Sequence, residues 1–182
     1  LVELNDRIRN MLTAAIDMAR NTGQGAGSLG EFSEDLVDRL RGMAQAYGLL
    51  SEAEWASVRL NDLAQAELSQ IDPSRLDIFG PELKLQPRQA LPVGLILREL
   101  ASHAARHGAL ATPEGRIAFS WDRDGDRVTL HWRENAGFDA PLEEGNGHGF
   151  ELIAAQVEGQ LGGEMVTEFS PGGLTFELSF FL

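Results

Sequence analysis

Cysteine is absent from the 182 residues, which excludes disulfides and thiolate metal sites. Basic side chains are scarce as well: the chain has 15 Lys and Arg but 28 Asp and Glu, which gives a formal net charge of −13 at pH 7. Such a surface repels phosphate backbones, so we expect neither nucleic acid nor an anionic membrane as a partner. No apolar run approaches the ~20 residues that span a bilayer, and no signal segment opens the chain, so we expect a cytoplasmic protein.

The first helix is predicted over residues 4–19, where apolar residues recur at three- and four-residue steps. The pattern already fits the first two residues and no N-cap precedes it, so we expect the natural helix to begin earlier, behind an upstream sensory domain. The stretch "NTGQGAGSLG" at 21–30 interrupts the pattern with four glycines, and Ser28 with Glu31 is a candidate capping box for the next helix.

A second helix follows, with apolar residues spaced near 3.5, which is typical of helices packed almost antiparallel. These residues are Phe32, Leu36, Leu40, Met43, Tyr47 and Leu50. Two helices alone cannot bury a whole core. The pattern therefore favours a parallel homodimer, in which two hairpins form a four-helix bundle.

The second half of the chain reads as alternating helices and strands. A helix at 60–68 leads into short strands in "RLDIFG" and "LKL", and then into a long apolar helix at 87–107. Two strand pairs follow, "RIAFSWDRD" with "RVTLHWREN" and "EMVTEF" with "LTFELSFFL", separated by a glycine-rich loop and a helix. We predict an α+β chain: a helical hairpin at 1–56, then an α/β sandwich at 57–182 with helices on one face of its sheet.

Three motifs in this half carry candidate site residues. "LRELASHAARHGAL" places acidic and imidazole side chains one turn apart on the long helix, and "LHWREN" ends a strand with a carboxylate. "GNGHGF" puts glycines at the start of a helix, where backbone N–H groups can approach a phosphate. The candidate residues are Glu99, His103, Glu134, Gly137, Gly147 and Gly149.

In this order and spacing the motifs resemble those of the HWE subgroup of sensor histidine kinases, over nearly the whole chain. The long helix resembles the N box of that family, "WRE" its tryptophan–glutamate signature and "GHGFELI" its last glycine box. The resemblance implies a dimerisation and histidine-phosphotransfer-like hairpin, a Bergerat-type ATP-binding domain and a response-regulator receiver domain as partner.

The chain departs from the family at four positions. The resemblance places Asp6, in "LNDRIRN", at the phospho-accepting histidine, and His103 at the magnesium-binding asparagine. Arg98 replaces the histidine that names the N box, and Glu151 puts an anion where the polyphosphate would lie. Magnesium prefers oxygen ligands to imidazole. We therefore expect no resident metal or cofactor, weak binding of ATP or ADP with Mg, and no autokinase activity.

Three functional hypotheses follow. The first is a degenerate histidine kinase module of two-component signalling, a dimeric pseudokinase or scaffold that docks a receiver domain. The second is a response-regulator phosphatase, in which Asn10, one helical turn after Asp6, orients water. The third is a regulator that keeps a nucleotide as a structural ligand.

Plain structural roles stand beside these hypotheses. Asp6 and Asn10 can be solvated helix residues, and the glycines of "GNGHG" can simply shape a tight loop. Glu99 can pair with a neighbouring arginine, Arg98 or Arg106. The His103 side chain can be half-buried and hydrogen-bonded, and we assign the Trp132 side chain to the core.

Overall fold

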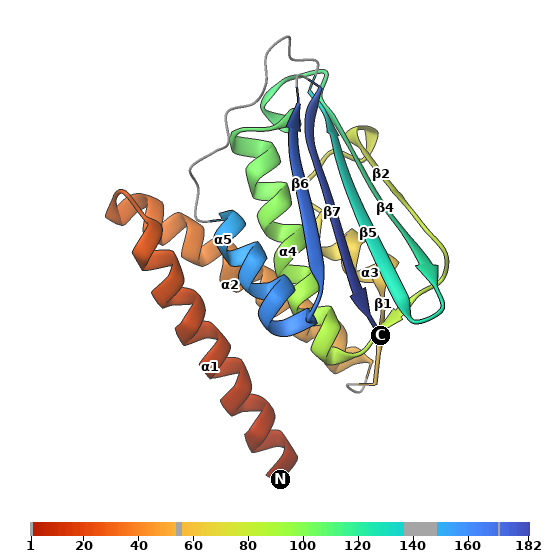
Figure 1. Cartoon of the computed structure of the whole chain (residues 1–182). Coiled ribbons are helices and arrows are strands. Elements are labelled where there is room, and N and C mark those ends of the chain that lie inside the picture. The colour runs from red at the N-terminus through yellow and green to blue at the C-terminus, as the bar shows by residue number, and fades with distance from the viewer. Residues whose placement is uncertain (1, 54–55, 137–148, 171) are drawn as a thin grey trace.

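The computed structural model describes residues 2–53, 56–136, 149–170 and 172–182. Helices α1 (Val2–Gly25) and α2 (Leu29–Glu52) form an open V beside a five-stranded sheet (Figure 1). The predicted break at 21–30 is too long, because α1 continues to Gly25 and the connection comprises only residues 26–28. Glycine inside a helix costs about 1 kcal/mol, which a long helix can tolerate.

The predicted helices and strands of the second half occur in the predicted order. The elements after α2 are β1 (Val58–Arg59), α3 (Leu60–Glu67), η1 (Pro73–Arg75), β2 (Leu76–Phe79), β3 (Lys84–Leu85), α4 (Pro87–Arg106), η2 (Ala109–Ala111), β4 (Arg116–Asp124), β5 (Arg127–Asn135), α5 (Gly149–Ala154), the π-helix η3 (Ala155–Leu161), β6 (Glu164–Ser170) and β7 (Gly173–Phe181). Of these, the structure adds β1, η1 and η2, which the sequence did not predict. No described helix is long and apolar enough to cross a membrane.

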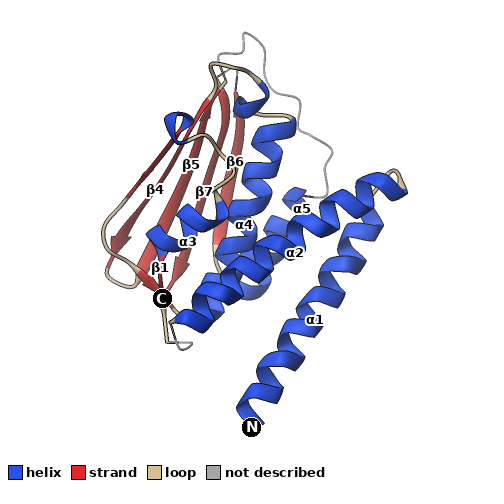
Figure 2. Ribbon diagram, turned by 180° about the vertical axis from the view of Figure 1, so that it is seen from behind, coloured by secondary structure: helices blue, strands red, loops and turns tan. Residues whose placement is uncertain are grey.

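The main sheet has the order β2-β4-β5-β7-β6. Only the β2–β4 pair is parallel in this sheet, as far as the described residues go. Strands β4 and β5 join through Gly125, whose φ of 60° suits a tight turn. Helices α3, α4, α5 and η3 cover one face (Figures 1 and 2). The predicted α+β architecture, a helical hairpin followed by a Bergerat-type sandwich, is confirmed.

Helix α4 lies between the sheet and α2, which explains why its sequence is apolar on several faces (Figure 2). Ala46 and Leu50 of α2 belong to the same core as Leu97 of α4 and Trp132 of β5. The C-terminal part of the predicted dimer seam is therefore buried inside its own chain. Leu36 lies nearer the connection at 26–28, the elbow of the hairpin, and stays partly exposed.

Candidate nucleotide site and its surroundings

Glu134, near the end of β5, is buried and hydrogen-bonded into the scaffold. Its Oε2 accepts the backbone N–H of Ala109 at 2.8 Å, and its Oε1 accepts the indole N–H of Trp132 at 3.1 Å. A side chain at Gly108 would collide with this carboxylate. Trp132 is 1% exposed, so its predicted place in the core is confirmed. The "WRE" motif thus fixes the strand end to the turn after α4.

His103, on α4, faces this carboxylate without a hydrogen bond to it. The distance from its Nδ1 to Glu134 Oε1 is 3.9 Å, and neither ring nitrogen has a hydrogen-bond partner among the described residues. Phe150 and Phe169 meet the ring edge to face, with centroid distances of 5.2 and 6.0 Å. The His103 side chain is 11% exposed, so it is more deeply buried than the predicted half-buried imidazole, and the predicted hydrogen bond is not found in the described structure.

The end of α4 carries a second imidazole, that of His107, and an arginine, Arg106, that contacts α2 of the hairpin. Partial burial lowers the pKa of His107, and the charges of His103 and Arg106 lower it further. Arg106 donates to Asp35 of α2 at 2.9 Å and to Ser102 at 3.0 Å. These contacts are exposed, so their contribution to stability is small.

Glu99 pairs with neither of the arginines that the sequence suggested. Arg39 of α2 donates to both of its carboxylate oxygens, from Nε at 2.6 Å and from Nη2 at 3.1 Å. Arg39 also donates from Nη1 to Thr22 Oγ1 of α1 at 2.7 Å. Both members of the pair are buried. The partner was missed because 60 residues separate the two side chains in the sequence, and local helix spacing shows only near neighbours.

Arg98 points to α2 and α3. Its Nε lies 3.7 Å from Glu67 Oε2, and its Nη2 donates to Gln45 at 3.0 Å. Burial raises the pKa of Glu67 to about 8, although the positive charge of Arg98 opposes the rise. Neither Glu67 oxygen accepts a hydrogen bond from a described residue. Glu67 is therefore mainly protonated at neutral pH.

Of the other predicted site residues, the structure describes only some. Asp6 and Asn10 lie in α1, but their side chains are outside the described part. Gly137 and Gly147 fall in the segment 137–148, which the structure does not describe. Gly149 opens α5, and a Cβ there would meet Glu99 Oε2 at 3.1 Å. The structure thus groups Gly149 with Glu99, and His103 with Glu134.

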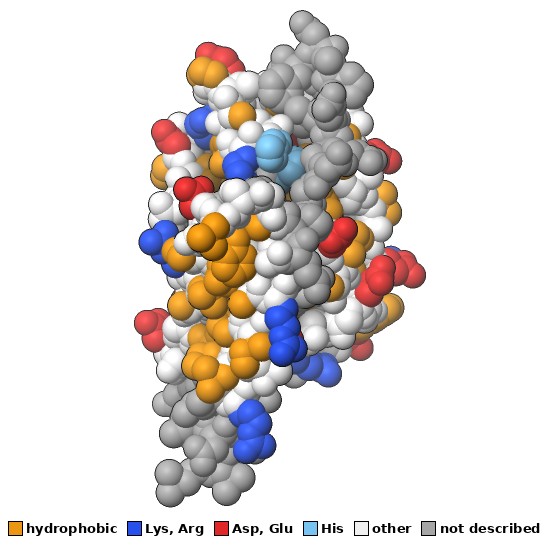
Figure 3. Space-filling model, turned by 90° about the vertical axis from the view of Figure 1, so that its left-hand side faces the viewer, with side chains coloured by type: hydrophobic (Ala, Val, Ile, Leu, Met, Phe, Trp, Pro, Cys, Tyr) orange, Lys and Arg blue, Asp and Glu red, His pale blue; other side chains and the backbone are white. Residues whose placement is uncertain are grey.

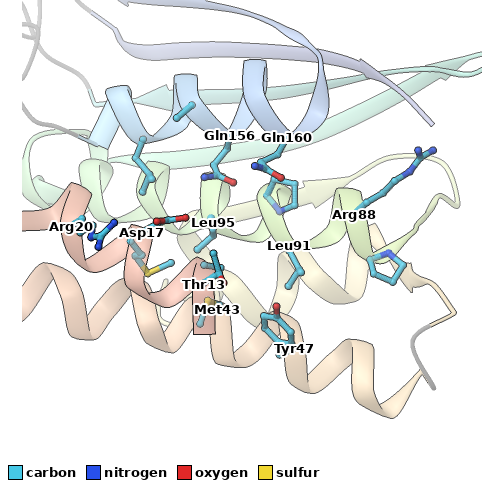
Figure 4. Close-up of a pocket in the computed structure, with 16 residues that line it drawn as sticks. Thr13, Asp17, Arg20, Met43, Tyr47, Arg88, Leu91, Leu95, Gln156 and Gln160 are labelled. Atoms are coloured by element: carbon cyan, nitrogen blue, oxygen red, sulfur yellow. The ribbon is translucent and has the colours of Figure 1, made fainter. Parts of the chain in front are cut away.

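A groove of about 760 Å³ lies beside the hairpin, between α1, α2, α4 and η3 (Figure 4). Gln156 and Gln160 of the π-helix face Thr13 and Asp17 of α1 across it. Burial raises the pKa of Tyr47, which also lines the groove. Within the described ranges, no cluster of three or more His, Asp or Glu side chains is placed to hold a metal ion.

Comparison with known sequences agrees with the sequence motifs. The family of HWE histidine kinases matches residues 3–82. A blue-light-activated histidine kinase of Rhizobium johnstonii is 28% identical over 180 residues, which cover 98% of this chain and 52% of that protein. The corresponding protein of Brucella anthropi is 27% identical over 97% of this chain and 37% of its own length. The chain therefore spans about half, or less, of these curated relatives.

Solved structures show the same fold. The blue-light-activated histidine kinase of Erythrobacter litoralis matches 99% of this chain and 60% of its own, with a TM-score of 0.76 at 14% identity. Its separate histidine kinase domain matches with a TM-score of 0.63 at 14% identity, over 93% of this chain and 94% of the domain. Histidine kinase ThkA, solved in complex with the response regulator TrrA, matches 98% of this chain and 60% of its own at a TM-score of 0.52 and 14% identity. The predicted resemblance is confirmed: this chain is similar in sequence to the HWE histidine kinases and has the histidine kinase fold.

Proposed function

We propose that this chain is a histidine-kinase-type module of two-component signalling that transmits a signal without phosphorylating itself. It acts as a dimeric pseudokinase or scaffold and docks a response-regulator receiver domain. The observation that carries the proposal is the hairpin sequence, because all four histidines, at positions 103, 107, 131 and 148, lie outside α1 and α2. Neither hairpin helix has an imidazole to accept a phosphoryl group.

The surroundings of His103 support the proposal. The resemblance puts a magnesium-binding asparagine at this position, and magnesium prefers oxygen ligands. Here an imidazole packs against Phe150 and Phe169, and the nearby Glu134 already accepts hydrogen bonds from Ala109 and Trp132. These residues therefore fit magnesium poorly, and we derive no reaction step through Mg-ATP.

The chemistry of phosphoryl transfer explains why the losses act together. The reaction needs a nucleophile, a bound nucleotide and a metal that neutralises the phosphate charge. Asp6 is a carboxylate at the nucleophile position, and Glu99 is held by Arg39. Restoring one part alone leaves the others missing, because such contributions behave as a unit.

An exposed apolar band supports the proposed dimer. Leu12 and Ile16 of α1 are each 53% exposed, and Val37 of α2 is 43% exposed. Figure 3, which looks onto the hairpin side, shows hydrophobic side chains gathered in a band along this face. Apolar side chains in such a band mark an interaction surface. An upstream sensory domain remains part of the proposal, since the curated relatives are longer than this chain.

The test uses labelled ATP with the natural chain, Asp6→His and Asp6→His/His103→Asn. We expect no acid-labile label on the natural chain or on the single variant, because imidazole alone would have no activated phosphate to attack. The double variant shows whether the magnesium position is the remaining defect. Acid-labile label on Asp6→His alone would mean that the nucleotide site is intact, and would overturn the pseudokinase proposal.

The phosphatase hypothesis rests on Asn10, one turn after Asp6 in α1. An amide at this place could orient water toward a phosphorylated receiver domain. A phosphorylated receiver incubated with the natural chain and with Asn10→Ala separates the two proposals. A scaffold leaves the decay rate of the phosphoryl group unchanged in both cases, whereas a phosphatase accelerates it with the natural chain only.

A further inference from the structure

We infer that Arg39, Thr22 and Glu99 form a buried latch that holds the helical hairpin against α4 in one fixed arrangement. The latch lies at the contact between the hairpin and the rest of the chain. It does not depend on the proposed function.

The centre of the latch is a bidentate ion pair between Arg39 and Glu99. Arg39 Nε and Nη2 donate to the two oxygens of Glu99 at 2.6 and 3.1 Å, so each carboxylate oxygen accepts a hydrogen bond from the guanidinium. Both side chains are 5% exposed. A bidentate arginine–carboxylate pair fixes orientation as well as distance, and removing one partner would leave the other charge buried and uncompensated.

The latch extends from this pair into α1. The third nitrogen of the guanidinium, Nη1, donates to Thr22 Oγ1 at 2.7 Å, and that hydroxyl donates to the backbone oxygen of Met18 at 2.7 Å. Thr22 is 2% exposed. One guanidinium therefore connects α1, α2 and α4, and the elbow of the hairpin cannot leave α4 without breaking charge-assisted hydrogen bonds in a buried site.

The position of Arg39 along α2 gives the contact its importance. From Leu29 to Asp38, no described side chain of α2 is buried, whereas Arg39, Met43, Ala46 and Leu50 are. Apolar packing thus holds the far end of α2, and Arg39 is the first buried contact on the elbow side. The ion pair Arg106–Asp35, nearer the elbow, is exposed and weaker.

The latch also lies beside the start of α5. The space next to Glu99 Oε2 is where a Cβ on Gly149 would fall, at 3.1 Å, so α5 begins directly against the latched carboxylate. The hairpin, α4 and α5 meet at this carboxylate. A displacement of the hairpin at its elbow would therefore free Glu99 at the point where the chain enters α5.

Hydrogen exchange of the full chain, followed by mass spectrometry, tests the latch with Arg39→Met and with Glu99→Gln. We expect exchange in residues 18–43 to accelerate by about ten-fold or more, while β5 and β7 exchange as before, because local opening exposes only the hairpin amides. Arg41→Met is the matched control, since Arg41 is an exposed arginine on the same helix. It should exchange like the natural chain.

The double variant Arg39→Met/Glu99→Gln tests whether the two residues act as a pair. A direct pair predicts an acceleration no larger than that of the stronger single variant, whereas multiplied effects would overturn it. Equal exchange in Arg39→Met and Arg41→Met, or acceleration spread evenly into β5 and β7, would also overturn the latch. If Arg39→Met does not fold, Thr22→Val decides: faster exchange confined to the hairpin supports the latch, and unchanged exchange contradicts it.

Discussion

Glu67 and Glu99 are buried carboxylates in the helical layer, and their surroundings differ in one respect. Glu99 accepts two hydrogen bonds from Arg39, so its charge is compensated. Glu67 accepts none from the described residues and has Arg98 Nε only at 3.7 Å, so burial raises its pKa to about 8. A directional hydrogen bond, more than the mere presence of an arginine, decides whether the charge is tolerated.

The first prediction concerns the pH dependence of stability. Glu67 ionises at an ordinary pKa of 4.5 when unfolded and about 8 when folded, so the folded state holds the extra proton between these values. The stabilising contribution is complete below pH 4.5 and is lost as the pH rises toward 8, by up to about 5 kcal/mol at 1.36 kcal/mol per pKa unit. Urea unfolding of Glu67→Gln, which mimics the protonated form, should lack this loss.

The comparison is the difference in unfolding free energy between Glu67→Gln and the natural chain, measured from pH 5 to pH 8.5. It should grow in favour of the variant as the pH rises. Glu82→Gln is the control, because Glu82 is an exposed glutamate. A constant difference across the range would show that Glu67 is already ionised at neutral pH.

The second prediction is weak or absent binding of Mg-ATP. His103 offers imidazole in place of an oxygen ligand, and Glu151 adds an exposed negative charge in the first turn of α5. Calorimetry with Mg-ATP should give no heat of binding at micromolar protein concentration. A dissociation constant in the micromolar range would favour the nucleotide-binding regulator over the pseudokinase.

At the scale of the elements, the strands of the main sheet were predictable, whereas β1 and the contacts between helices were not. Apolar residues alternate with polar ones along β4 and β5, and this local period of two predicts both strands. Gly125 between them marks the turn. The end of α1 at Gly25 was misplaced because a long helix tolerates the low helix propensity of glycine, and Thr22 near this end is hydrogen-bonded to Arg39. The Arg39–Glu99 pair was invisible because an arginine inside an amphipathic helix gives no signal of a distant partner.

The third prediction uses two glycines of α2. A Cβ at Gly42 would lie 3.1 Å from Arg98 Nε and 3.2 Å from Glu67 Oε2, whereas a Cβ at Gly48 would meet nothing within 4 Å. Gly48→Ala should therefore raise the unfolding free energy by about 0.5–1 kcal/mol through helix propensity. Gly42→Ala gains the same propensity but crowds the buried side chains of Arg98 and Glu67, which costs about 1–3 kcal/mol.

Thermal and urea unfolding of the two alanine variants give a direct comparison, because both substitutions make the same chemical change in one helix. Gly42→Ala should be less stable than Gly48→Ala by at least about 1 kcal/mol. Equal stabilisation of both variants would mean that α2 is not packed closely against α3 and α4 at Gly42.

At the scale of the whole molecule, the fourth prediction is a homodimer through the hairpin. Light scattering at micromolar concentration should give twice the chain mass. Ile16→Ser should yield monomers at that concentration with little loss of folding stability, because Ile16 is 53% exposed in the single chain and would become buried only in the dimer. Phe79→Ser, at a residue 58% exposed on the sheet, should remain dimeric. A monomeric natural chain would remove the dimer from the proposal.

The parallel pairing of β2 with β4 has a consequence for the order in which the molecule folds. Strands β4 and β5 are neighbours in the sequence, so their pairing closes only a short loop. Leu76 of β2, in contrast, pairs with Ile117 of β4 across the whole of α4, and such long-range closure is slow. The pairing of β5 with β7 is long-range as well, since Arg133 pairs with Thr175, so we expect the β4–β5 and β6–β7 hairpins to form first and the β5–β7 and β2–β4 pairs to follow. Until then the outer edge of β4 is open, and newly made chains are most prone to aggregate during that interval.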